Sequence, residues 1–157
     1  MKAVLEMEWL VVIHVLSAII GLGPAYAFPF ILRNTSSVIE MERALGYVAR
    51  LEVFPKVFGT LAILSGLCLF WLGSYGSFLQ IWIIGTLIVY IVIEVLIIGF
   101  LNPNAKKLHE SLSMPDKTSH GAPPSSVTLM YLRVRNLHMW ASVLSIIIFI
   151  LMIIKPH

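Results

Sequence analysis

The chain has 157 residues, enough for one ordinary domain, but its composition excludes a soluble one. Apolar residues make up 59% and charged residues 12% of the sequence, whereas a soluble domain is typically about 45–50% apolar and about 25% charged. The formal net charge of +3 is carried by basic residues that flank apolar runs, which indicates membrane topology signals and excludes nucleic acid as a partner.

Four apolar runs are each long enough to cross a bilayer, because a hydrocarbon core of about 30 Å needs roughly 20 helical residues. We expect these spans at about residues 9–32, 53–72, 79–101 and 137–154. A short Gly/Ser turn joins the second run to the third, so these two should form an antiparallel hairpin. The predicted fold class is an all-α membrane protein, a single four-transmembrane-helix bundle over residues 1–157.

The first run also has features of a signal peptide. It follows Met1-Lys2, and Ala25-Tyr26-Ala27 resembles an A-x-A cleavage site. However, the apolar stretch is too long for a signal peptide, and Glu6 and Glu8 interrupt the basic segment that should precede it. We therefore expect this run to be retained as the first transmembrane helix.

The segments between the spans are polar. Residues 37–50 have the pattern of an amphipathic helix on the cytoplasmic membrane surface. Its expected apolar face consists of Val38, Ile39, Leu45 and Val48. Asn102-Pro103-Asn104 should end the third helix, because the residue before a proline resists helical geometry. Residues 114–126 are rich in Pro, Ser and Gly and predict a mobile linker, after which residues 127–136 should extend the fourth helix.

Lys and Arg gather beside the first and third loops. Nine of them flank these loops, namely Arg33, Arg43, Arg50, Lys56, Lys106, Lys107, Lys117, Arg133 and Arg135. Only Lys2 and Lys155 lie on the other side. By the positive-inside rule we expect loops one and three in the cytoplasm and both termini outside, in a bacterial cytoplasmic (inner) membrane.

Ionisable side chains inside a bilayer are costly, so each one suggests a function. His14 lies in the first span with small residues on its helical face, including Gly21. Such a face permits either close approach of another helix or a flat cofactor, since a neutral imidazole is a good ligand for haem iron. A glycine seam in the second span, which includes Gly66, leaves the same two alternatives open.

A second polar group lies in the third span. Thr86, Tyr90 and Glu94 recur every fourth residue, which predicts one stripe facing the bundle interior. Glu94 could form a structural ion pair or handle protons. Cations at a similar depth that could pair with it are Arg50, Lys56, Arg135 and His138.

The ends of the first and fourth spans carry short motifs that resemble a known family. They read Trp9-Leu-Val-Val-Ile-His14, Gly21-Leu-Gly23, Pro29-Phe-Ile-Leu-Arg33, Arg133-Val-Arg-Asn136 and Lys155-Pro156. This layout resembles the HemJ-type protoporphyrinogen oxidases, small bacterial membrane proteins that bind haem b. It is more loosely similar to the membrane domain of copper-resistance D proteins, and is most similar overall to uncharacterised four-helix bacterial membrane proteins.

The resemblance implies haem b with His14 as axial ligand. It does not extend to protoporphyrinogen oxidation, because the family's lysine four residues after the helix-three tryptophan corresponds to Thr86 here, and Leu137 and His138 replace its Glu-Pro. His14 and His138 should differ in depth by roughly 20 Å at a rise of 1.5 Å per residue, so they cannot share one iron. The haem would be five-coordinate or use Met152, with Lys155 as a candidate partner for a propionate.

Three functions follow from these observations. The first is a haem b membrane protein for redox chemistry or binding of a diatomic gas, with Gly21, Gly66 and Thr86 lining the cofactor. The second is a proton-coupled transport module centred on Glu94, supported by Tyr90 and Arg135. The third is an accessory subunit of a membrane complex, held to its partner or to a second copy by the glycine faces.

Overall fold

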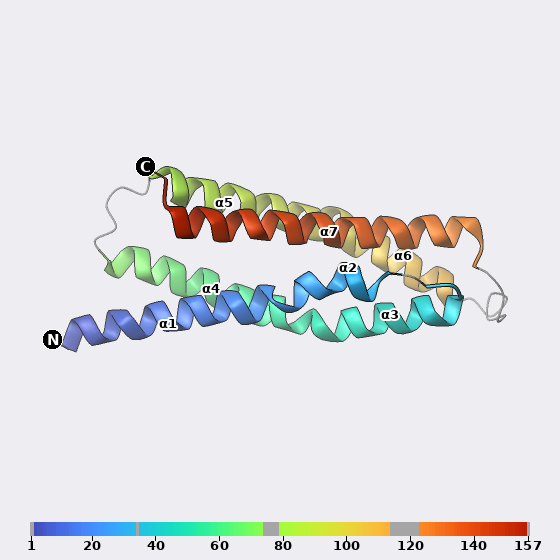
Figure 1. Ribbon diagram of the computed structural model, residues 1–157, viewed down its shortest axis with the longest axis horizontal. Coiled ribbons are helices and arrows are strands. Elements are labelled where there is room, and N and C mark those ends of the chain that lie inside the picture. Colours follow the sequence, from blue (N-terminus) through green and yellow to red (C-terminus); the bar gives the residue numbers. More distant parts are fainter. Residues whose placement is uncertain (1, 34, 74–78, 114–122, 157) are drawn as a thin grey trace.

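The computed structural model describes residues 2–33, 35–73, 79–113 and 123–156, and all regular structure within these ranges is helical. Four stretches are long and apolar enough to cross a membrane, and they run antiparallel with both chain ends at one end of the bundle (Figure 1). These stretches are Met7–Ile31, Val38–Leu72, Ile81–Leu112 and Ser125–Ile154. The predicted four-helix membrane architecture is confirmed.

The first stretch is broken, although the sequence predicted one helix over residues 9–32. It consists of α1 (Lys2–Leu22), the 3₁₀ turn η1 (Pro24–Ala27) and the short α2 (Phe28–Ile31). Pro24 cannot donate a backbone hydrogen bond, and it is tolerated because it lies in the first turn of η1. The break therefore reflects the Gly23-Pro24 pair.

The second stretch contains α3 (Val38–Leu51) followed at once by α4 (Val53–Leu72). The prediction that residues 37–50 form an amphipathic helix is confirmed, with Ser37 as its N-cap. The prediction that this helix lies on the membrane surface is wrong, because α3 extends α4 as part of the bundle (Figure 1). Its apolar face packs on protein, and Met41 and Ala44 are buried there whereas Ile39 and Leu45 are only partly covered.

The third stretch does not end at residues 102–104 as predicted. It runs through α5 (Ile81–Glu94), the π-helix η2 (Val95–Leu101) and α6 (Asn102–Leu112). Pro103 occupies the first turn of α6, where a missing N–H is least costly. The wider π-helical turns precede it, and the Asn104 side-chain amide donates to the carbonyl of Phe100 at 2.6 Å. The proline therefore changes the helix geometry without stopping the helix.

The fourth stretch is a single helix, α7 (Ser125–Ile154). It includes both the predicted span at 137–154 and its predicted extension at 127–136. Most of the predicted linker, and the Gly/Ser turn from residue 74 onward, lie outside the described residues. The linker is shorter at its far end than predicted, since residues 125 and 126 are already helical.

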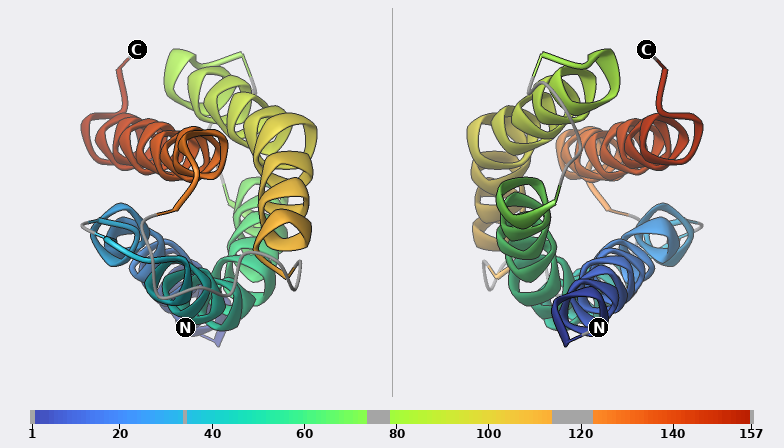
Figure 2. Two further views of the ribbon diagram at one scale, coloured as in Figure 1. Left: turned by 90° about the vertical axis from the view of Figure 1, so that its right-hand side faces the viewer. Right: turned by 90° about the vertical axis from the view of Figure 1, so that its left-hand side faces the viewer.

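Each helix packs chiefly on its neighbour in the chain, α1 on α4 and α5 on α7 (Figure 2). The backbones of α1 and α4 approach closely at Gly21, where a Cβ would lie 2.9 Å from the backbone nitrogen of Gly59 and 3.1 Å from the backbone carbon of Phe58. Small residues let two membrane helices approach to this distance. Gly21 therefore serves a helix crossing.

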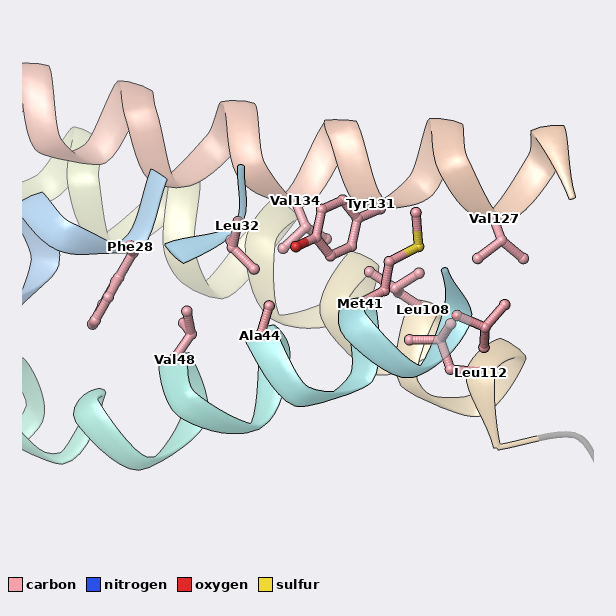
Figure 3. Close-up of a cluster of buried hydrophobic side chains, with 11 residues drawn as sticks. Phe28, Leu32, Met41, Ala44, Val48, Leu108, Leu112, Val127, Tyr131 and Val134 are labelled. Atoms are coloured by element: carbon pink, nitrogen blue, oxygen red, sulfur yellow. The ribbon is translucent and has the colours of Figure 1, made fainter. Parts of the chain in front are cut away.

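A buried hydrophobic cluster, drawn in Figure 3, lies toward the end of the bundle opposite the termini, where Figure 1 labels α3 and α6. Its side chains come from α2, α3, α6 and α7 and point into one shared space. They are Phe28, Leu32, Val38, Met41, Ala44, Val48, Leu108, Leu112, Val127, Tyr131 and Val134. The bundle thus has a dry core of its own at this end, which is also the end where the basic residues gather.

The lengths of the helices explain why such a core is needed. The second stretch has 35 residues and so spans about 52 Å at 1.5 Å per residue, well beyond a hydrocarbon core of about 30 Å. Charged α6 and amphipathic α3 form the protruding part. In water this part must bury apolar side chains against one another, whereas in lipid the outward faces of the helices can stay apolar.

We expect Gly21→Ala to destabilise the protein by about 1–3 kcal/mol, because the added methyl group meets backbone that cannot rotate away. Gly59→Ala is the matched control, since its Cβ would meet nothing within 4 Å and should cost nothing. The measurement is the thermal unfolding midpoint of each variant in detergent. Equal effects of the two substitutions would contradict this account of the crossing.

Candidate functional site

The His14 side chain of α1 packs against α4, and of its two ring nitrogens only Nδ1 is hydrogen-bonded among the described residues. Its Nδ1 is 2.8 Å from the carbonyl oxygen of Ala62 and 3.2 Å from Oγ of Ser65. A carbonyl can only accept, so Nδ1 carries the proton and, in the neutral ring, Nε2 keeps a lone pair. Nε2 has no hydrogen bond among the described residues. This is the arrangement by which metal-binding histidines are usually oriented.

Gly66 makes room for this imidazole. A Cβ at Gly66 would lie 2.9 Å from Cε1 of His14 and 3.3 Å from its Nδ1. The seam glycine predicted to border a cofactor therefore borders the histidine itself. Gly21, the other glycine with that expected role, lies at the α1–α4 crossing, so helix packing accounts for it.

Other predicted cofactor residues lie near the same level of the bundle. Gly66 is six residues before the end of α4 and Thr86 five residues after the start of α5, so each lies about 8–9 Å from that end. Thr86 Oγ1 is buried and has no hydrogen-bond partner within the described structure. A Cβ at Gly85, next to Thr86, would lie 3.2 Å from Cδ1 of Leu151, next to Met152. The structure thus places Thr86 and Met152 at one depth.

Lys155 lies at the end of α7 and its ammonium group is 5.5 Å from the centre of the Trp82 ring. It has a positive φ of 47°, and this left-handed residue ends the helix. A contact at this distance is a cation–π interaction. The lysine predicted to pair with a propionate is therefore held over an aromatic ring near the start of α5.

His138 is buried at a different level. Its ring meets that of Phe28 edge to face, with centroids 5.2 Å apart. Phe28 follows His14 by 14 positions in the chain, which corresponds to about 20 Å along a helix. This placement puts His138 beside the dry core at the basic end, and the separation of about 20 Å from His14 stays a prediction.

Glu94 and Tyr90 are paired, but the stripe does not face the interior along its whole length. The Tyr90 hydroxyl donates to Glu94 Oε1 at 2.6 Å. Glu94 also lines a surface hollow with Ile91, Val95 and Ile98, which are each more than half exposed. Neighbouring helical residues point about 100° apart, and the buried one here is Ile93.

None of the cations proposed for Glu94 pairs with it in the part of the chain that the structure describes. Lys56 pairs instead with Glu52, with 3.0 Å between Nζ and Oε2. His138 packs on Phe28, and Arg135 lines a separate groove between α2 and α7. Tyr90 and Glu94 are therefore bonded to each other, but the described structure does not bring Arg135 or the buried His138 to them.

Sequence reasoning missed the groups that orient His14. The Ala62 carbonyl is backbone and leaves no trace in a residue pattern. Ser65 was detectable in principle, since it lies one residue before Gly66 on a helix facing His14. It also missed two buried serines of α7, of which Ser142 donates to the Ala25 carbonyl at 3.2 Å and Ser145 to the Tyr26 hydroxyl at 3.0 Å. These bonds tie the broken first span to α7.

Within the described residues there is no group of three or more His, Cys, Asp or Glu side chains that could hold a bare metal ion. The site instead offers one donor atom, Nε2 of His14, on a ring whose orientation is fixed by the Ala62 carbonyl. Such a donor suits a metal that brings most of its own ligands, and a porphyrin iron is of that kind. The residues around His14 fit an axial ligand better than a protein-only metal centre.

This fold, four long apolar helices joined in antiparallel order, defines a multi-pass integral membrane protein. The chain belongs to the family described as "Predicted integral membrane protein (DUF2269)", whose model matches residues 8–156. The match confirms the expected membership of an uncharacterised membrane family. No curated protein and no solved structure matches the chain.

The hydrogen bond to Ala62 predicts the tautomer of His14. We expect ¹⁵N NMR of histidine-labelled protein, at a pH where the imidazole is neutral, to show a protonated Nδ1 and an unprotonated Nε2. The signal is assigned by its loss in His14→Gln. Exposed His109 serves as an internal comparison, because its ring lacks such a carbonyl contact within the described residues. A protonated Nε2 with a bare Nδ1 would refute the assigned geometry.

Proposed function

We propose that this protein binds haem b, with Nε2 of His14 as an axial ligand to the iron. The observation that carries the proposal is the 2.8 Å contact between Nδ1 and the Ala62 carbonyl, which leaves the other ring nitrogen available. A carbonyl oxygen that accepts from the other ring nitrogen fixes the orientation of the imidazole and raises its basicity as a ligand. The resemblance of the Trp9 to His14 segment to HemJ-type proteins supports the same ligand.

Two further residues support the proposal from the other helix pair. Thr86 has a buried hydroxyl without a partner in the described structure, and burying a hydroxyl unpaired is costly. An oxygen of a bound group would satisfy it. Met152 lies near the depth of Thr86, so its thioether would be the candidate for a second protein ligand, and without it the iron would have an open position. His138 is too far along the bundle to take that position.

Haem b supplies a one-electron couple when both axial positions are filled, and a binding site for a diatomic gas when one is open. The protein's own contribution is to orient the imidazole through the Ala62 carbonyl and to hold the ligand close to one end of the bundle. We assign redox chemistry or gas binding to the protein, and we do not assign protoporphyrinogen oxidation because Thr86 stands where that reaction's lysine would be.

We also propose that the protein resides in a bacterial cytoplasmic membrane with both termini outside. The support is the charge distribution, since nine of eleven Lys and Arg residues flank the loops at the end opposite the termini. The dry core and α6 would then project into the cytoplasm. His14, Thr86 and Met152 would lie in the outer half of the bilayer.

The haem proposal is tested by the absorption spectrum of protein expressed with ample haem. We expect a Soret band in the wild-type protein and its loss in His14→Ala. His138→Gln is the matched control, a buried histidine at the other level, and it should keep the band. A wild-type protein without a Soret band would end the proposal, and a band that survives in His14→Ala would remove His14 as the ligand.

The orientation is tested by cysteine labelling in intact cells, with Cys68→Ser as the background. A membrane-impermeant maleimide should label Glu8→Cys, at the end that carries the termini, from outside. Ser113→Cys, at the end of α6, should be labelled only after the membrane is opened. Both side chains are exposed on the bundle and lie toward opposite ends of it, so their labelling reports the side of the membrane. The reverse pattern would invert the proposed topology.

A further inference from the structure

A groove of about 440 Å³ runs along the outside of the bundle between α2 and α7. Its apolar wall includes Phe30 of α2, which is 72% exposed, and three residues of α7, Met139, Val143 and Ile146, which are 43–48% exposed. These side chains lie on the outer surface of the bundle, where lipid would contact them, and not in the dry core. Together they form an apolar channel open to the bilayer.

One end of this groove is strongly basic. Arg33, just after α2, and Arg135, in α7, both line it. In the part of the chain that the structure describes, neither guanidinium has a carboxylate within ion-pair distance. Two unpaired guanidinium groups at one end of an apolar channel create a site for an anion, because arginine forms charge-assisted and often bidentate bonds to phosphate oxygens.

The polarity and length of the groove match one class of ligand. From Arg135 to Ile146 it follows eleven residues of α7, about 16 Å, which is close to half of a hydrocarbon core of about 30 Å. A molecule that fills it must be anionic at one end and apolar over the thickness of one leaflet. We infer that this groove binds an anionic phospholipid, with its phosphate between Arg33 and Arg135 and an acyl chain along Met139, Val143 and Ile146.

Hydrogen bonds beneath the groove hold its two walls, the broken part of the first span and α7, in a fixed relative position. Ser142 lines the groove and donates to the carbonyl of Ala25 at 3.2 Å, and Tyr26, also in the lining, accepts from Ser145 at 3.0 Å. These bonds join the broken segment of the first span to α7. The lipid site is therefore built on the break at Gly23-Pro24, and it is independent of haem and of His14.

The test compares the stabilisation of the purified protein by phosphatidylglycerol and by phosphatidylcholine, titrated into detergent micelles and followed by the unfolding temperature. We expect phosphatidylglycerol to stabilise the wild-type protein at concentrations at which phosphatidylcholine does not. The double variant Arg33→Gln/Arg135→Gln should bind phosphatidylglycerol about tenfold to thirtyfold more weakly, from two lost contacts near the membrane surface.

Arg50→Gln/Arg133→Gln is the matched control, because it removes the same charge from exposed positions outside the groove lining and should leave the response unchanged. Val143→Trp should weaken the lipid effect by filling the channel while both arginines remain.

Three results would overturn the inference: equal responses to the two lipids, an unchanged response in the Arg33/Arg135 variant, or equal stabilisation by inorganic phosphate, which would indicate an anion site without a lipid. If the Arg33/Arg135 double variant no longer elutes as a single species in gel filtration, Val143→Trp takes its place. An unchanged stabilisation of Val143→Trp by phosphatidylglycerol would then count against the lipid site.

Discussion

The constraint on which this structure depends is the difference between the length of its helices and the thickness of a bilayer. A 35-residue stretch extends about 52 Å, whereas the hydrocarbon core is about 30 Å thick. The bundle must therefore be stable in lipid along part of its length and in water along the rest. Near the termini the helices pack in pairs and show apolar side chains outward, as at Leu64 and Ile153, which are 56% and 79% exposed. At the other end they close around a core that includes Leu108 and Val134, both with 0% exposure.

The existence of the four membrane helices could be predicted from the sequence because hydropathy over twenty residues is a direct measure of lipid compatibility. Helix ends were harder to predict because they depend on tertiary packing. Pro103 was expected to end a helix, yet it opens α6 after a π-helical segment. Residues 37–50 have an amphipathic pattern that suits either a membrane surface or a protein surface, and only the position of α2, α6 and α7 decides between them.

The candidate site could be predicted in part. A lone histidine in a span draws attention by its cost in lipid, and His14 proved to be held by a neighbouring helix. The interactions that orient His14 could not be predicted, because they depend on the carbonyl of Ala62 and on the space beside Gly66. Glu94 shows the opposite case. Its four-residue spacing from Tyr90 correctly placed the two side chains together, but periodicity cannot tell an inward stripe from an outward one when lipid and protein are equally apolar.

The pairing of the helices also bears on how the protein is made. Because α1 packs chiefly on α4 and α5 on α7, the first and third spans each find their main partner in the span that leaves the ribosome next. The first hairpin, with its Gly21–Gly59 crossing, can assemble in the membrane before the third span is synthesised, since its contacts need no later residue. Local pairing of this kind lowers the loop-closure cost of each step. The core at the basic end combines α2, α3, α6 and α7, so it has to wait for the complete chain.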